Sequence, residues 1–124
     1  MTTHVTEYLL VIRTDGTTIH VLGRERGEWR WSSAIVDLRD DGATARSANV
    51  YRFGKRIDDI DAVDKNFLAQ VVERDGPLLV VPASVDKTDL EPFVAVGRAH
   101  AAARQIAIAH AKTWPKTMRV LAKK

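Results

Sequence analysis

The stretches YLLVI (residues 8–12) and LLVV (residues 78–81) are the two most apolar runs of this chain. Each is short and continuous, which is typical of a strand that is buried on both faces of a sheet. Asp15-Gly16 follows the first run and Pro82 follows the second, and both are turn signals. We therefore expect these two runs to form central strands that lie side by side.

Three further strands and a helix are predicted between these runs. Residues 17–22 and 29–38 are β-rich and predict a second and a third strand. Residues 48–53 predict either a short strand or an irregular return of the chain. Asp61 or Asp64 then caps a helix whose apolar residues repeat at helical spacing up to the second apolar run.

The last third of the chain predicts a second helix and a final strand. Thr88 and Glu91 match a capping box, and an alanine-rich helix over residues 93–113 follows it. Residues 117–124 form either an edge strand, over residues 117–122, or a basic tail.

The predicted element order is β-β-β-(β)-α-β-α-β, in a single α/β domain over residues 1–124. With the two apolar strands at the centre, the strand order is 3-2-1-4-5 in a mixed sheet with an antiparallel half and a parallel half. That is a ribonuclease H-like topology. The alternative is a ferredoxin-like or profilin-like α+β sandwich.

Composition limits the class of protein. The chain has 124 residues, of which 45% are apolar and 28% charged, as in a globular domain. It has no cysteine, which excludes disulfides, thiolate metal sites and cysteine nucleophiles. No apolar run approaches the roughly 20 residues of a membrane helix, and the N-terminus lacks the features of a signal peptide. We therefore expect a cytoplasmic protein with no membrane association.

Charge is segregated along the chain. Residues 1–91 carry 12 Lys and Arg against 16 Asp and Glu, a net charge of −4, whereas residues 92–124 carry seven bases and no acid. Such a basic segment can attract nucleic acid, although a solvated helix face with a basic tail has the same composition. The candidate phosphate-binding residues are Arg98, Arg104, Lys112, Lys116, Arg119, Lys123 and Lys124.

No catalytic constellation is found in the sequence. A ribonuclease H-like nuclease needs carboxylates on its central strands to hold two metal ions, and residues 8–12 and 78–81 contain none. The four histidines lack metal-ligand spacing, and no serine stands in a nucleophile elbow. We therefore expect no enzymatic activity, no metal site and no cofactor.

Trp29-Arg30-Trp31 is the second candidate site. On an exposed sheet face, alternating aromatic and basic residues could stack on nucleotides. The pattern places Trp29, Trp31 and Ile35 on one face, which favours a core or a dimer interface. Trp29 and Trp31 are therefore candidate residues for binding a protein partner.

Residues 64–93 resemble part of a known family. The chain has a Phe-bearing helix (DKNFLAQVV, residues 64–72), then Gly76, LLVV, Pro82-Ala83 and KTDL (residues 87–90). This order is similar to small bacterial proteins related to the middle domain of archaeal and eukaryotic peptide-chain release factors, labelled "translational machinery" or "host attachment". The chain departs from the family at Val81, where Gly is usual, and by one extra residue before Lys87. It also lacks the Gly-Gly-Gln motif of peptide release.

Two functional hypotheses follow. The resemblance implies a ribonuclease H-like fold without catalytic carboxylates, in a non-catalytic module associated with RNA or the ribosome. The alternative is an immunity or regulatory protein that forms a homodimer or binds another protein through Trp29 and Trp31.

Overall fold

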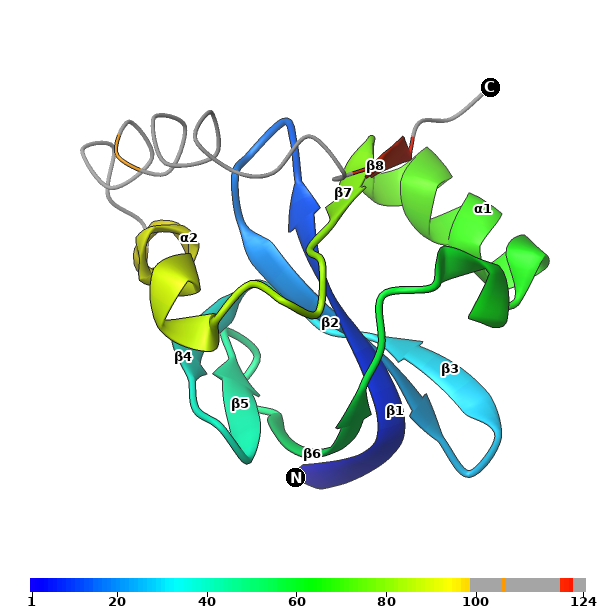
Figure 1. Ribbon diagram of the computed structural model, residues 1–124, viewed down its shortest axis with the longest axis horizontal. Coiled ribbons are helices and arrows are strands. Elements are labelled where there is room, and N and C mark those ends of the chain that lie inside the picture. The colour runs from blue at the N-terminus through cyan, green and yellow to red at the C-terminus, as the bar shows by residue number, and fades with distance from the viewer. Residues whose placement is uncertain (99–105, 107–118, 122–124) are drawn as a thin grey trace.

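The computed structural model describes residues 1–98, 106 and 119–121. Its strands are β1 (Thr2–Arg13), β2 (Ile19–Glu25), β3 (Glu28–Trp31), β4 (Ile35–Leu38), β5 (Gly42–Ala45), β6 (Val50–Arg56), β7 (Leu78–Val80) and β8 (Arg119–Leu121). Its helices are α1 (Lys65–Asp75) and α2 (Glu91–Gly97), with 3-10 turns η1 (Ile60–Ala62) and η2 (Lys87–Leu90). Figure 1 shows a bent sheet with α1 on one side and α2 on the other.

Strand β1 organises the sheet because its 12 residues are enough to pair with three other strands. It pairs antiparallel with β2 along one edge. Along its other edge, β6 runs parallel to residues 2–8 and β7 runs antiparallel to residues 11–13. β3 continues the sheet beyond β2, β5 and β4 continue it beyond β6, and β8 pairs with β7.

Both faces of β1 are buried, as its continuous apolar run predicts. Tyr8, Leu10 and Ile12 join one hydrophobic cluster, which includes residues of η2 and α2. Leu9 and Val11 join a second cluster, in which α1 covers the opposite face. Successive strand residues point to opposite faces, so an uninterrupted apolar run is what a strand between two helical layers requires.

The α/β class and the mixed sheet are confirmed. The neighbour order β3-β2-β1-β7-β8 also agrees with the predicted order 3-2-1-4-5. The strand directions differ, because β7 is antiparallel to β1 and β8 is antiparallel to β7. The parallel half of a ribonuclease H-like sheet is therefore not formed by these strands. The parallel neighbour of β1 is β6, which occupies the first half of the same edge.

Helix ends follow local capping chemistry. The Asp64 side chain accepts hydrogen bonds from the backbone N–H groups of Asn66 and Phe67, which confirms Asp64 as a cap of α1. Gly76, at φ 86°, ends that helix in a conformation that favours glycine. No described helix is long and apolar enough to cross a membrane.

The capping box predicted at Thr88 and Glu91 is wrong. Asp86 is the cap instead, and its side chain accepts from the backbone N–H and the hydroxyl of Thr88 to begin the 3-10 turn η2. α2 then starts at Glu91 without a side-chain cap. The helix predicted over residues 93–113 is described as far as Gly97, and most of its remainder lies outside the described residues.

The third predicted strand, residues 29–38, is divided into β3 and β4. Ser32 lies at the break and is fully buried. Its backbone N–H donates to Val21 O, and its hydroxyl oxygen accepts from Val21 N. The chain turns there, so Ile35 joins the cluster under α2, whereas Trp29 and Trp31 pack against the cluster under α1. The prediction that these three residues share a face is therefore wrong.

Candidate anion-binding pocket

A pocket of about 370 Å³ lies between several strand ends and the end of α1. Its lining comes from the end of β1, the start of β2, the end of β3, the connections after β3 and β5, and the end of α1. Segments far apart in the sequence therefore build it together. Its volume is at the lower end of the range for small-ligand pockets, about 300–1,000 Å³.

His20 forms the buried base of this pocket, with a residue exposure of 4%. Its Nδ1 atom lies 3.0 Å from Ser32 O. Because a carbonyl oxygen can only accept, Nδ1 carries the proton. Nε2 then accepts from the Thr18 hydroxyl, 2.8 Å away. Both ring nitrogens are therefore hydrogen-bonded in the neutral imidazole.

The electrostatics keep His20 uncharged. Burial is the main cause that lowers its pKa to about 4, against the opposing hydrogen bond to Ser32 O. Arg13 and Arg46 lower the pKa further, and Asp75 raises it. At neutral pH the imidazole thus carries no charge. The indole of Trp31 stacks on it, with ring centroids 4.6 Å apart and planes inclined by 10°.

Two arginines of the pocket keep a charge that no described carboxylate neutralises. Arg13 donates from Nε to Asp75 O at 2.8 Å. Arg46 donates from Nε and Nη2 to Gly97 O at 3.0 and 2.7 Å. Among the described residues, neither guanidinium has a carboxylate oxygen within 4.0 Å. The carbonyls fix the two side chains without cancelling their charge.

The other charged pair in the pocket is neutral as a unit. Arg74 Nε lies 3.2 Å from Asp75 Oδ2. Together with Arg13 and Arg46, this pair leaves the pocket with a net charge of +2 when His20 is neutral. Anions bind well where guanidinium groups are fixed before the ligand arrives.

The packing of α2 positions Arg46. Gly97 lies against the backbone of Ile35, where a side chain on residue 97 would clash with Ile35 O. This close approach of helix to strand brings Gly97 O within reach of Arg46, which follows β5. The pocket therefore depends on the contact between α2 and β4.

Thr18 and His20 resemble a nucleophile and its base, but their environment argues against catalysis. A general base works best with a pKa near the operating pH, and the pKa of His20 is about 4. The Thr18 residue is also only 9% exposed. Among the residues that the structure describes, no group of three or more His, Asp or Glu gathers to hold a metal ion.

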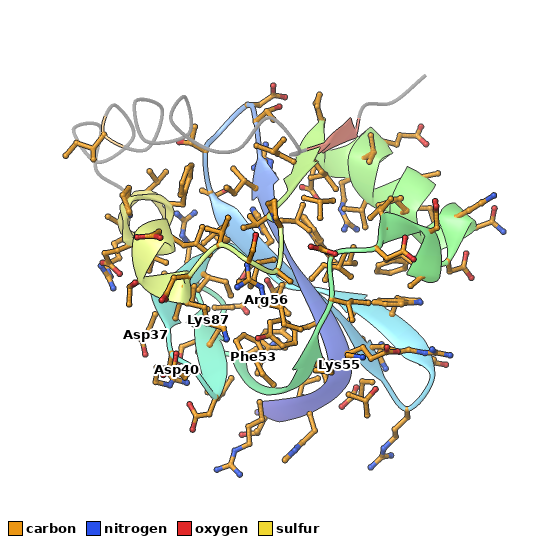
Figure 2. All side chains as sticks on the ribbon, in the orientation of Figure 1. Asp37, Asp40, Phe53, Lys55, Arg56 and Lys87 are labelled. Atoms are coloured by element: carbon orange, nitrogen blue, oxygen red, sulfur yellow. The ribbon has the colours of Figure 1, made fainter. Side chains whose placement is uncertain are left out.

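A second basic cluster contrasts with this pocket. Arg56 donates from Nη1 to Val85 O at 2.6 Å and from Nη2 to Pro82 O at 2.9 Å. Lys87 Nζ lies 5.6 Å from the ring centroid of Tyr8 and 5.4 Å from that of Phe53, and it donates to Asp40 O. Figure 2 shows Arg56, Lys87 and Phe53 between β6 and the segment that leads to α2.

The cations beside this second cluster are already partnered. A hollow of about 460 Å³ lies next to Lys87, larger than the His20 pocket. Its Arg39 pairs with Asp37 and Asp41, and its Glu91 pairs with Arg98. We therefore choose the His20 pocket as the candidate site because of its charge rather than its size.

The structure places only part of the predicted basic segment. Arg98 is exposed, and it donates to Glu91 Oε1 and to Val36 O, both at 2.8 Å. Arg119 begins β8. Arg104, Lys112, Lys116, Lys123 and Lys124 lie outside the described residues. Phosphate binding by this segment stays a prediction.

Trp29 and Trp31, the residues predicted to bind a partner, are half-buried against the cluster under α1. Met1 and Ile106 are the exposed large hydrophobic side chains in the described part of the chain. The apolar surface of the two indoles is thus partly used within the fold, and partner binding by them stays a prediction.

Sequence reasoning missed Arg13, His20 and Arg46. The sequence did contain a signal for His20, because it stands between Ile19 and Val21 in a β-rich run. A histidine buried in such a strand needs hydrogen-bond partners for both ring nitrogens. No family model, no curated protein and no solved structure matches this chain.

Proposed function

We propose that this protein is a non-catalytic module that binds RNA, free or in the ribosome, in the cytoplasm. The observation that supports this proposal best is the pocket in which Arg13 and Arg46 hold charge that no described carboxylate neutralises. Guanidinium groups fixed in this way suit the oxygens of a phosphate. The seven bases of residues 92–124 would add phosphate contacts along the same polyanion.

The chemistry of the described residues fits binding rather than turnover. The buried, neutral His20 is a poor base at neutral pH, and the described residues hold no cluster of metal ligands. Phosphate contacts give affinity and salt dependence and carry no sequence information. We therefore expect RNA binding with weak sequence preference.

Binding of a mixed-sequence, single-stranded oligoribonucleotide between about 50 and 200 mM salt tests the proposal. The affinity of the wild-type protein should fall steeply over this range. The double variant Arg104→Glu, Lys112→Glu should bind more weakly, with a slope of log K against log salt shallower by roughly 1.4, since each single-strand phosphate contact contributes about 0.7.

The matched control is the double variant Lys55→Glu, Lys65→Glu, which makes the same change of net charge at two exposed residues of β6 and α1. It should keep the wild-type slope. No RNA binding by the wild-type protein at low salt, or equal losses in the two double variants, would overturn the proposal.

A further inference from the structure

We propose that the His20 pocket binds the terminal phosphate monoester of a nucleotide, and that an RNA end supplies it. This inference deepens the proposed RNA binding and rests on it. The group that it assigns to the pocket is a phosphate with a single ester bond, and not the phosphate diesters inside a strand.

Charge favours a monoester over a diester. The pocket has a net charge of +2, from Arg13, Arg46 and the neutral pair of Arg74 and Asp75. A phosphate monoester carries about −1.5 to −2 at pH 7, whereas each diester inside a strand carries one negative charge. The monoester therefore neutralises the pocket, and an internal phosphate leaves about half of its charge uncompensated.

The hydrogen-bond donors that remain also suit a terminal phosphate. Arg13 uses only Nε on a described acceptor, and Arg46 uses only Nε and Nη2. A guanidinium has five N–H donors, so both side chains keep N–H groups that no described residue accepts. A terminal phosphate offers three oxygens free of ester bonds, one more than an internal phosphate.

Buried polar groups hold the wall of the pocket in place. Ser32, which borders the pocket, is fully buried, and its hydroxyl oxygen accepts from Val21 N. His20 is neutral at neutral pH and adds no charge to the two of the arginines. Hydrogen bonds to backbone groups fix the side chains of Ser32 and His20, so this wall of the pocket is organised without a ligand.

The size of the pocket is compatible with the end of a strand. About 370 Å³ gives room for one group of nucleotide size. This volume is large enough for a terminal nucleotide together with its phosphate.

The test compares one oligoribonucleotide in three forms: with a 5′-phosphate, with a 3′-phosphate, and with hydroxyls at both ends. Adenosine monophosphate and inorganic phosphate are the further probes. We expect one phosphorylated form to bind about tenfold more tightly than the unphosphorylated form, as suits charge-assisted hydrogen bonds. Arg46→Gln should remove this advantage, and the control Arg52→Gln, at an exposed residue of β6, should keep it.

Phosphorus NMR with the wild-type protein gives a second readout that needs no variant. The resonance of the terminal phosphate should shift on binding more than those of the internal phosphates. This measurement decides the question if Arg46→Gln, which loses its bonds to Gly97 O, does not fold.

The outcomes separate the two proposals. Equal binding of all three forms would overturn the pocket assignment and leave RNA binding standing. Binding of adenosine monophosphate but of no oligoribonucleotide would overturn the RNA source and support the monoester, supplied by a free nucleotide. No binding of any probe would overturn both proposals.

Discussion

Arg56 and Arg46 are both held by hydrogen bonds to backbone carbonyls, but their surroundings differ. Both side chains follow or end a strand, and both donate to backbone carbonyls far along the chain. Arg56 is half-buried, and this burial lowers the pKa of its guanidinium. Its buried Nε has no hydrogen-bond partner among the described residues. Arg46 is exposed and lines a pocket.

The difference gives a criterion for the proposed site, because anchoring to carbonyls is common to both arginines. Arg56, at the end of β6, donates to the carbonyls of Pro82 and Val85 and so holds the loop before η2 against that strand. The carbonyl at Gly97 fixes Arg46 and leaves donors that face solvent. An arginine becomes a site when its remaining N–H groups stay accessible and no carboxylate cancels its charge.

The largest expected effect concerns pH and the base of the pocket. His20 has a pKa of about 4 in the folded protein, against 6.5 as its ordinary value. The unfolded state therefore binds more protons between these values, so stability is complete above pH 6.5 and falls as pH drops toward 4. The loss should reach about 3 kcal/mol.

Urea unfolding followed between pH 7 and pH 4 measures this loss. His20→Leu should flatten the pH dependence by that amount, whereas His4→Asn, at an exposed residue of β1, should leave it as in the wild-type protein. An unchanged slope in His20→Leu would show that acid sensitivity arises elsewhere in the chain.

The second prediction tests whether Arg56 contributes to stability alone. Arg56→Leu leaves the carbonyls of Pro82 and Val85 without their donor, which should lower the free energy of unfolding by about 2 kcal/mol. The affinity of the folded protein for RNA should not change. A loss of RNA affinity at full stability would instead make Arg56 part of a binding surface.

Local patterns in the sequence identified the centre of the fold. The continuous apolar runs at residues 8–12 and 78–81 became neighbouring strands buried on both faces, and Asp64 became the cap of α1. These outcomes depend on residues next to one another along the chain. Strand direction depends instead on pairing between segments that are distant along the chain, as the parallel pairing of β6 with β1 shows.

Apart from the burial of His20, the candidate site could not be predicted from the sequence for the same reason. Arg13, His20 and Arg46 come together only because the chain turns at Ser32 and α2 packs closely on β4 at Gly97. The sequence shows nothing that relates Arg46 to Gly97, 51 residues apart. The charge pattern, by contrast, drew attention to residues 92–124, of which the structure describes few.

The smallest expected effect concerns Lys87. Its ammonium lies over the stacked rings of Tyr8 and Phe53, whose centroids are 3.9 Å apart. Lys87→Met keeps the length of the side chain and removes the cation, so it should lower the free energy of unfolding by about 0.5–1 kcal/mol. Urea unfolding measures the change, with Lys55→Met at an exposed residue of β6 as the matched control.

RNA affinity in the same two variants tests the contrast between the regions directly. If the Lys87 ammonium is held by rings and by Asp40 O for the stability of the fold, Lys87→Met weakens RNA binding no more than Lys55→Met does. A greater loss of affinity in Lys87→Met would mean that partnered cations also contact the ligand, and the criterion of an unneutralised, accessible guanidinium would be too narrow.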